Sequence, residues 1–190
     1  MSEEGFILTQ GVDADITGVR SAYTTTEGGY RAVMSAEKLL PAAKELVGLL
    51  DEPVFFFLEL PESDDEEDGE YGVYYLDNCT LPVAQAILER YGELLTQDGI
   101  TRFGFGSHTT EEEVYFTDYQ MADIYCPGNT AAAKVLEKAG LERTDSLVTL
   151  WDNISEDAPG ICMRVELNGE TTADIVENLR GEGMYKADNS

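Results

Sequence analysis

Apolar residues recur three or four positions apart in four segments of the chain, the spacing of one buried helical face. The predicted helices span residues 36–50, 81–95, 130–139 and a last segment that opens near residue 171. Ser35 is a candidate N-cap for the first helix, and Pro41 predicts a kink or a late start there. Thr80 is a candidate N-cap for the second. Thr171 and Asp174 have the spacing of a capping box.

Short apolar, aromatic or alternating runs predict strands between these helices. The predicted strands span residues 54–58, 71–76, 100–105, 114–119, 122–125, 147–151 and 161–167. The run at 54–58 is apolar at every position, which is typical of a strand covered on both faces. The run at 161–167 alternates apolar and polar residues, which predicts one face on the core and one in water.

This order of elements predicts an α+β fold, with about four helices packed on a mixed or largely antiparallel sheet. We expect residues 1–190 to form a single domain, because no linker-like segment divides the chain. An alternative division would separate residues 1–60 as a small N-terminal lobe. Strand-like segments flank the acidic stretch 61–70 on both sides, which favours a hairpin loop within one domain.

The chain is strongly acidic, with 38 Asp and Glu against 12 Lys and Arg and a formal net charge of −26. Seven of the acidic residues lie in the stretch 61–70, but without them acids still outnumber bases more than twofold. Such a surface repels phosphate backbones and anionic lipids, both of which are bound by basic residues. The charge therefore argues against nucleic-acid and membrane binding and favours a basic protein partner.

The partner hypothesis treats the protein as a non-enzymatic binding or inhibitory module, similar in role to an immunity protein that neutralises a basic nuclease. The ten tyrosines support it, because tyrosine is enriched in protein interfaces and stacks on Arg or Lys. The candidate partner-binding residues are Glu62, Asp64, Asp65, Glu66, Glu67, Asp68, Glu111, Glu112, Glu113 and Tyr115. Another interpretation is a salt-adapted globular domain whose acidity serves solubility and indicates no partner.

An alternative hypothesis is a small enzyme with a site near His108 and Cys79. His108 is the only histidine, so any nucleophile with an imidazole base must use it. It follows a predicted strand end, and Cys79 with Asp77 follows another, so these three residues are the candidate catalytic group. The sequence lacks the Gly-x-Ser-x-Gly pattern of a nucleophile elbow, and no helix that could activate the cysteine is recognisable beside it.

We expect no cofactor and no metal. Neither of the common glycine-rich nucleotide-binding motifs occurs. Residues 64–69 and 13–18 match the first half of a calcium loop, but both lack the acidic residue at position twelve. The three cysteines lack paired zinc-site spacing. Since no signal peptide or membrane-spanning run is recognisable, we expect a cytoplasmic protein.

Overall fold

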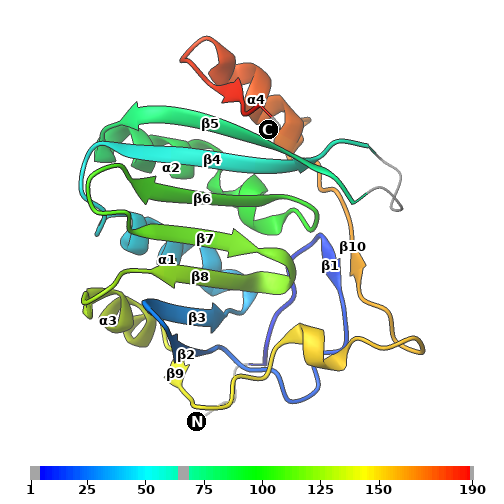
Figure 1. Cartoon of the computed structure of the whole chain (residues 1–190). Helices are drawn as coiled ribbons and strands as arrows, with labels where there is room; N and C mark the ends of the chain where they lie inside the picture. The colour runs from blue at the N-terminus through cyan, green and yellow to red at the C-terminus, as the bar shows by residue number, and fades with distance from the viewer. Residues whose placement is uncertain (1–4, 64–68, 189–190) are drawn as a thin grey trace.

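A nine-stranded sheet runs through the computed structural model, which describes residues 5–63 and 69–188 (Figure 1). The strand order is β11-β5-β4-β6-β7-β8-β3-β2-β9, and every pair is antiparallel except the parallel pair β2–β9. The strands are β2 (Ala22–Thr26), β3 (Gly29–Val33), β4 (Val54–Pro61), β5 (Tyr71–Cys79), β6 (Arg102–Ser107), β7 (Glu113–Thr117), β8 (Met121–Tyr125), β9 (Glu142–Arg143) and β11 (Tyr185–Lys186).

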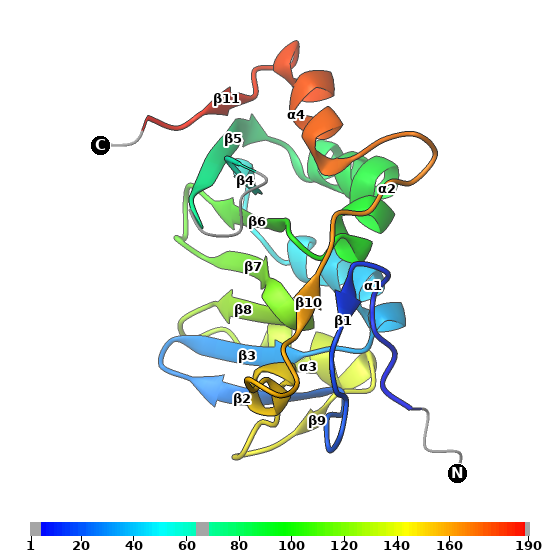
Figure 2. The ribbon, with the colours of Figure 1, turned by 90° about the vertical axis from the view of Figure 1, so that its right-hand side faces the viewer.

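The helices of the described residues cover one face of this sheet and leave the other without a helical layer (Figures 1 and 2). The helices are α1 (Ala36–Val47), α2 (Leu81–Gln97), α3 (Ala131–Lys138) and α4 (Thr172–Arg180). The main core lies between α1–α3 and the sheet, where fully buried side chains such as Leu46, Leu88, Phe56 and Phe105 meet. The α+β class and the largely antiparallel sheet are therefore confirmed.

The predicted helices form close to the expected positions. Helix α1 begins at Ala36 and continues through Pro41, so the predicted late start is wrong. The hydroxyl of Ser35 does not cap α1, because it accepts from the backbone N–H of Ile7 and donates to Glu37. The side chain of Thr80 does cap α2, and the carboxylate of Asp174 accepts the backbone N–H of Thr171 at the start of α4.

The strand prediction over residues 54–58 was correct in position but wrong about its surroundings. Strand β4 lies between β5 and β6, as a central strand should. Phe56 and Leu58 point to the helices and are fully buried, whereas Phe55 and Glu59 lie on the other face and are half-buried. No helix of the described residues covers that second face, where Phe57 is buried only by neighbouring side chains, so the strand is not enclosed by helices on both sides.

Strands β4 and β5 pair antiparallel as a hairpin, with Pro61 opposite Tyr71 at the end of the pairing. The backbone N–H of Glu62 donates to the carbonyl oxygen of Glu70 at the end of this pairing. Residues 64–68 lie outside the described part of the chain. The N-terminal segment also joins the same sheet, because β3 pairs with β8.

Two predicted strands late in the chain are largely irregular. Residues 147–151 lead into the short 3-10 helix η2 (Leu150–Asn153), and only β10 (Ile161–Cys162) forms within 161–167, paired with β1 (Val12–Asp13). The alternation over 161–167 does not bury its apolar side, since Ile161 and Met163 are half exposed and only Val165 is buried. A second 3-10 turn, η1 (Asp118–Gln120), joins β7 to β8.

Candidate functional site

The face of the sheet opposite α1–α3, called here the open face, is organised by the strand register. Residues at paired positions on neighbouring strands project to the same side of a sheet. One row of paired positions crosses the sheet through Tyr185, Tyr75, Phe57, Gly104, Tyr115, Asp123, Arg31 and Thr24. A neighbouring row passes through Phe55, Gly106, Glu113 and Tyr125. The open face therefore alternates aromatic, glycine and charged positions.

Aromatic rings form a continuous layer over its upper strands. The ring centroid of Phe57 lies 5.3 Å from that of Tyr115 and 6.2 Å from that of Tyr75. Phe55 lies 6.1 Å from Tyr75, and Tyr75 lies 6.2 Å from Tyr185 on the short edge strand β11. Phe57 is buried beneath its neighbours, whereas the other four rings keep surface accessible to solvent. The layer is thus a partly exposed aromatic surface.

Two glycines of β6 make room for this layer. An ideal Cβ at Gly106 would lie 2.3 Å from the ring of Phe55, and one at Gly104 would lie 2.4 Å from the ring of Phe57. Real Cβ atoms do not approach ring carbons so closely, so the two rings occupy the space above the glycine backbone. The sequence Gly104-Phe105-Gly106 is therefore explained by packing, with Phe105 on the opposite, helix-covered side.

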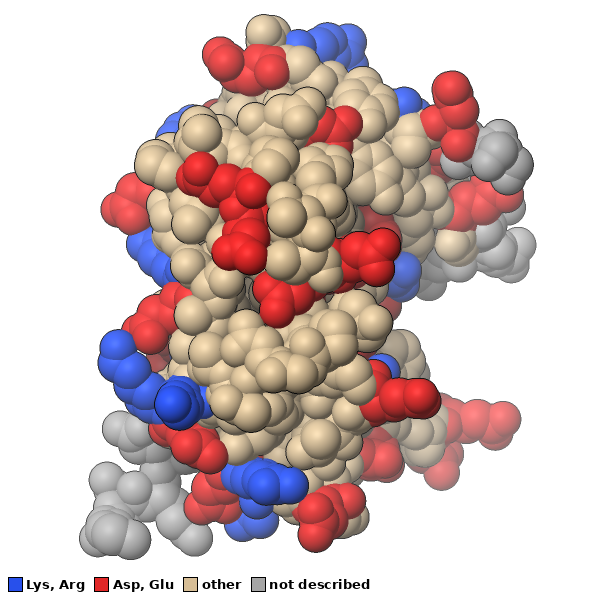
Figure 3. Space-filling model, turned by 60° about the vertical axis from the view of Figure 1, so that its left-hand side comes forward, with Lys and Arg blue, Asp and Glu red and all other residues tan. Residues whose placement is uncertain are grey.

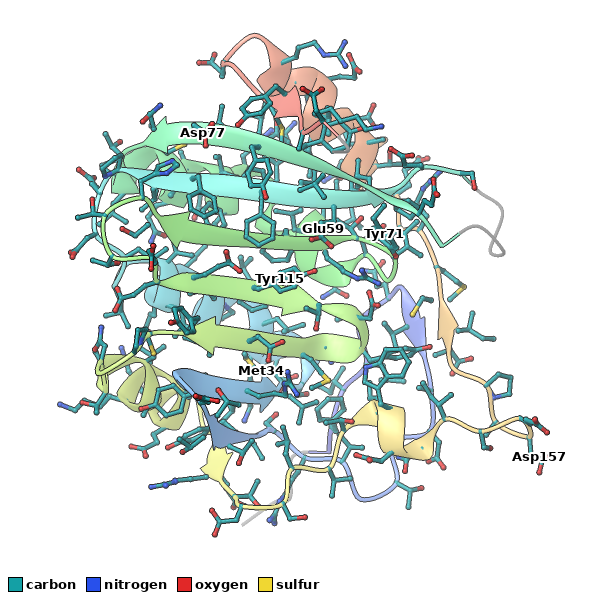
Figure 4. All side chains as sticks on the ribbon, viewed as in Figure 1. Met34, Glu59, Tyr71, Asp77, Tyr115 and Asp157 are labelled. Atoms are coloured by element: carbon teal, nitrogen blue, oxygen red, sulfur yellow. The ribbon has the colours of Figure 1, made fainter. Side chains whose placement is uncertain are left out.

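Four carboxylates stand among or beside these rings, and Figure 4 shows Asp77 and Glu59 on the same side as Tyr115. Glu59 accepts a hydrogen bond of 2.8 Å from the Tyr115 hydroxyl. Asp77 accepts a hydrogen bond of 2.7 Å from the Tyr185 hydroxyl. Asp123 forms an ion pair with Arg31 on the adjacent strand, with 2.7 Å between Oδ1 and Nε. Three of the four carboxylates therefore have fixed partners.

The fourth carboxylate, Glu113, forms no side-chain hydrogen bond or ion pair with any residue in the described ranges 5–63 and 69–188. It is half-buried opposite Gly106. Burial, and then the negative charge of Glu59, raise the pKa of Glu113. Its charge also contributes to the raised pKa of Tyr75, after the larger effect of burial. Glu113 is therefore an unneutralised carboxylate beside the aromatic layer.

Arg102 is a second basic residue of the open face, besides Arg31, and it is held by two carboxylates and a ring. Its guanidinium donates to both carboxylate oxygens of Asp118, at 3.0 and 2.7 Å, and lies 3.7 Å from Glu59. It also stacks over Tyr71, with 4.1 Å from Cζ to the ring centroid. The hydrogen bonds to Asp118 are the main cause of the raised pKa of Arg102. The guanidinium of Arg102 is thus hydrogen-bonded to one carboxylate, lies close to a second and stacks on one aromatic ring.

The candidate catalytic residues come together only in part. Asp77 Oδ1 lies 3.4 Å from His108 Nε2, and the His108 ring lies 5.0 Å from that of Phe55. Cys79 is buried in the main core, where its thiol lies 3.6 Å from the carbonyl oxygen of Leu76. Burial, followed by the charge of Asp77, raises the pKa of the Cys79 thiol. The position of Cys79 therefore disfavours the thiolate that a nucleophile requires.

The candidate partner-binding acids divide into three groups. Asp64, Asp65, Glu66, Glu67 and Asp68 lie outside the described residues. Glu62 forms an ion pair with Lys186 of the edge strand β11.

The remaining candidates lie at the β6–β7 turn and on β7. Glu111 is exposed, with a positive φ of 60°. Glu112 accepts hydrogen bonds from Thr110 and Asn129, at 3.2 and 3.3 Å. Glu113 and Tyr115 follow on β7 and belong to the open face. The structure thus connects this predicted cluster to the aromatic layer.

Sequence reasoning missed the residues that complete the site, mainly Phe55, Glu59 and Asp123. The signal was present in β4, where Phe55, Phe57 and Glu59 alternate with core residues. Residues 54–58 are all apolar, so the sequence does not show which of them face the core and which face the open side.

A hollow borders the lower part of the open face, where η2 stands beside β3 and β8. Its lining includes the Arg31–Asp123 ion pair and Trp151. Trp151 is half exposed and meets Tyr119 edge-on, with 4.5 Å between centroids. This hollow extends the recessed surface beyond the aromatic layer.

Acidic side chains gather across the middle of the view in Figure 3, whereas basic side chains lie mainly towards the edges. Within the described residues, no three His, Cys, Asp or Glu side chains are placed to hold a metal ion. No helix among the same residues is both long and apolar enough to cross a membrane. Comparison with known proteins finds no matching family model, curated protein or solved structure.

Proposed function

We propose that this protein is a non-enzymatic binding module that engages a basic protein partner through the open face of its sheet. The observation that carries the proposal is a partly exposed aromatic layer beside the unneutralised carboxylate of Glu113, on a face that no helix covers in the part of the chain that the structure describes. Aromatic residues supply most of the contact energy in many interfaces, and the surrounding charges select the partner.

The charge of the whole chain supports a basic partner rather than nucleic acid or an anionic membrane. At a net charge of −26, the long-range field attracts cations and repels phosphates. A second copy of the chain is also disfavoured on this face, because it would place Glu59, Asp77 and Glu113 against other carboxylates. An inhibitory role follows naturally, since a protein of this charge would cover the basic surface with which a nuclease binds its substrate.

The enzyme alternative has less support. Asp77 and His108 are adjacent, but Cys79 is buried and its raised pKa opposes ionisation. The hydroxyl of Tyr185 also donates a hydrogen bond to the second carboxylate oxygen of Asp77, Oδ2. An orienting carboxylate and an imidazole are thus present without an activated nucleophile.

The test compares capture of proteins from the source organism's lysate by three tagged forms of the chain. One is wild type, one is the face variant with Asp77→Asn and Glu113→Gln, and one is a control with Glu156→Gln and Asp157→Asn. Glu156 and Asp157 are exposed, and Figure 4 shows Asp157 at a loop tip far from the face. The face variant and the control therefore lose the same charge.

We expect wild type and control to retain the same basic protein at about 50 mM salt and to release it as salt rises, because screening weakens charge attraction. The face variant should retain much less of it. Equal retention by all three forms would refute the open face as the binding site. If the wild-type chain retained only acidic or neutral proteins, the proposal of a basic partner would be refuted.

A further inference from the structure

The surroundings of Arg102 show how this protein surface holds a guanidinium group. Tyr71 stacks on one side of Arg102 at 4.1 Å, Asp118 binds it through two hydrogen bonds, and Glu59 lies 3.7 Å away. A flat cation between a ring and carboxylates combines cation–π stacking with charge-assisted hydrogen bonds. The open face therefore contains one complete arginine site built from its own residues.

A second set of the same components lies farther along strands β4 and β5 and on β7, with no guanidinium beside it among the described residues. Phe55 and Tyr75 supply adjoining rings, with centroids 6.1 Å apart and with both side chains partly accessible. Glu113 lies on the far side of Gly106, over which the ring of Phe55 extends. This carboxylate has no side-chain partner among the described residues. Ring surface and free carboxylate are thus side by side, as they are around Arg102.

We propose that this second set is the recognition site for an arginine side chain of the partner, with the guanidinium stacked on Phe55 and Tyr75 and hydrogen-bonded to Glu113. The inference rests on the proposed function and names the group that the open face recognises. Burying the guanidinium against Glu113 would neutralise a carboxylate that is otherwise desolvated beside Glu59. Binding a cation should therefore lower the free energy of Glu113 more than it would that of a fully exposed carboxylate.

Arginine fits this site better than lysine. The guanidinium is planar, stacks on aromatic rings and presents several donors in a rigid fork. An ammonium group is a compact and strongly hydrated charge that loses more solvation on a ring surface. Simple charge attraction would not distinguish the two, so a preference for arginine is the signature of stacking plus directed hydrogen bonds.

The test is calorimetric titration of the full chain with oligo-arginine and oligo-lysine peptides of equal length. Wild type should bind the arginine peptide about fivefold or more tightly, the scale of a cation–π contact at a partly desolvated site. Glu113→Gln and Tyr75→Leu should abolish this preference. Tyr75→Phe, which keeps the ring, and Asp157→Asn, which removes a remote charge, should preserve it. Thermal unfolding of each variant checks that it is folded.

Three results would overturn the inference, and they affect the proposed function differently. Equal affinity for both peptides, reduced equally by Glu113→Gln, would remove the arginine site but leave the open face as a cation-binding surface. A preference that survives in both Glu113→Gln and Tyr75→Leu would place the arginine site elsewhere. Failure of wild type to bind either peptide would contradict the electrostatic basis of the proposed function as well.

Discussion

The ring of Phe55 occupies the space that a side chain at position 106 would need. An ideal Cβ at Gly106 would lie 2.3 Å from Cζ of Phe55 and 2.7 Å from Cε1. The glycine and the phenylalanine are paired across β6 and β4, so the strand register itself produces this contact. Gly106 therefore holds the aromatic layer against the sheet and keeps the carboxylate of Glu113 close to a ring.

Replacing Gly106 with alanine should displace the Phe55 ring. We expect Gly106→Ala to destabilise the fold by about 1–3 kcal/mol, the usual range for overpacking. Gly181→Ala is the matched control, because Gly181 ends α4 in a helical conformation and a Cβ there would meet nothing within 4 Å. Urea unfolding of both variants checks the prediction. A Gly106→Ala protein as stable as Gly181→Ala would show that the ring moves freely and that the layer is not fixed.

Glu113→Gln should make the isolated protein more stable at neutral pH. Burial and the charge of Glu59 raise the pKa of Glu113 in the folded state, so its ionised form disfavours folding. The protonated form of Glu113 stabilises the fold at low pH. This stability is lost as pH rises from the pKa of the unfolded state, about 4.3, through the raised pKa of the folded state. The variant should therefore gain about 0.5 kcal/mol near pH 7, a typical size for a partly exposed charge.

The stability gain of Glu113→Gln should shrink near pH 4, where the wild-type carboxyl is largely protonated in both states. Urea unfolding at the two pH values measures the difference. A gain of the same size at both would mean that it does not arise from ionisation. A loss of stability near pH 7 would mean that Glu113 has a stabilising partner in the folded protein.

The three cysteines should react slowly with iodoacetamide in the native protein, and Cys162 should react first. Burial is the main cause of the raised pKa of all three thiols. Cys79 and Cys126 are buried, whereas Cys162 is only half-buried. Mass spectrometry of peptides after timed labelling gives the order. Fast labelling of Cys79 that is lost in His108→Ala would instead support an enzyme with a thiolate nucleophile.

Arg102 should contribute far more to stability than an exposed arginine does. Arg102→Gln breaks the two hydrogen bonds to Asp118 and leaves that carboxylate half-buried, so we expect a loss of about 1–3 kcal/mol. Arg20→Gln removes the same charge from an ion pair with Glu142 whose side chains are 69% and 66% exposed. Its effect should stay within about 0.5 kcal/mol. Similar losses in both variants, measured by urea unfolding, would contradict the account of the Arg102 site.

The helices and the central hairpin could be predicted because their signals are local. Helix α2 combines apolar spacing with a threonine cap and an Asp98-Gly99 ending, and it forms as expected. The β4–β5 hairpin followed from two strand-like segments on either side of a polar loop. In both cases the residues that define the element lie within about 25 positions of one another, so the prediction needed no contact between distant parts of the sequence.

The β2–β3 hairpin was missed although it had a recognisable signal. Thr24, Thr25 and Thr26 favour a strand, and Gly28, with a φ of 88°, supplies the left-handed turn. Its place beside β8 depends on pairing between residues about 90 positions apart, which no local pattern reports. The strand prediction over 161–167 was wrong for a different reason: its local alternation is real, but beyond Cys162 the segment pairs with no strand of the described residues.

The candidate site was only half predictable. Glu113 and Tyr115 were expected from the acidic and tyrosine-rich composition, and both lie on the open face. The roles of Phe55 and Gly106 depend on the register between β4 and β6 and on which face the helices leave uncovered. A charge count cannot show that Glu113 has no side-chain partner within residues 5–63 and 69–188 while Glu59, Asp77 and Asp123 have partners there.

The most direct test of the open face is the affinity of the captured basic protein, purified, for the three forms of the chain at about 50 mM salt. We predict that the face variant, with Asp77→Asn and Glu113→Gln, binds about tenfold more weakly than wild type, a loss of about 1.4 kcal/mol. The control with Glu156→Gln and Asp157→Asn should stay within about threefold of wild type, as expected for exposed charges remote from a contact. Equal affinity of all three forms would contradict the account, because the partner would then not recognise the open face.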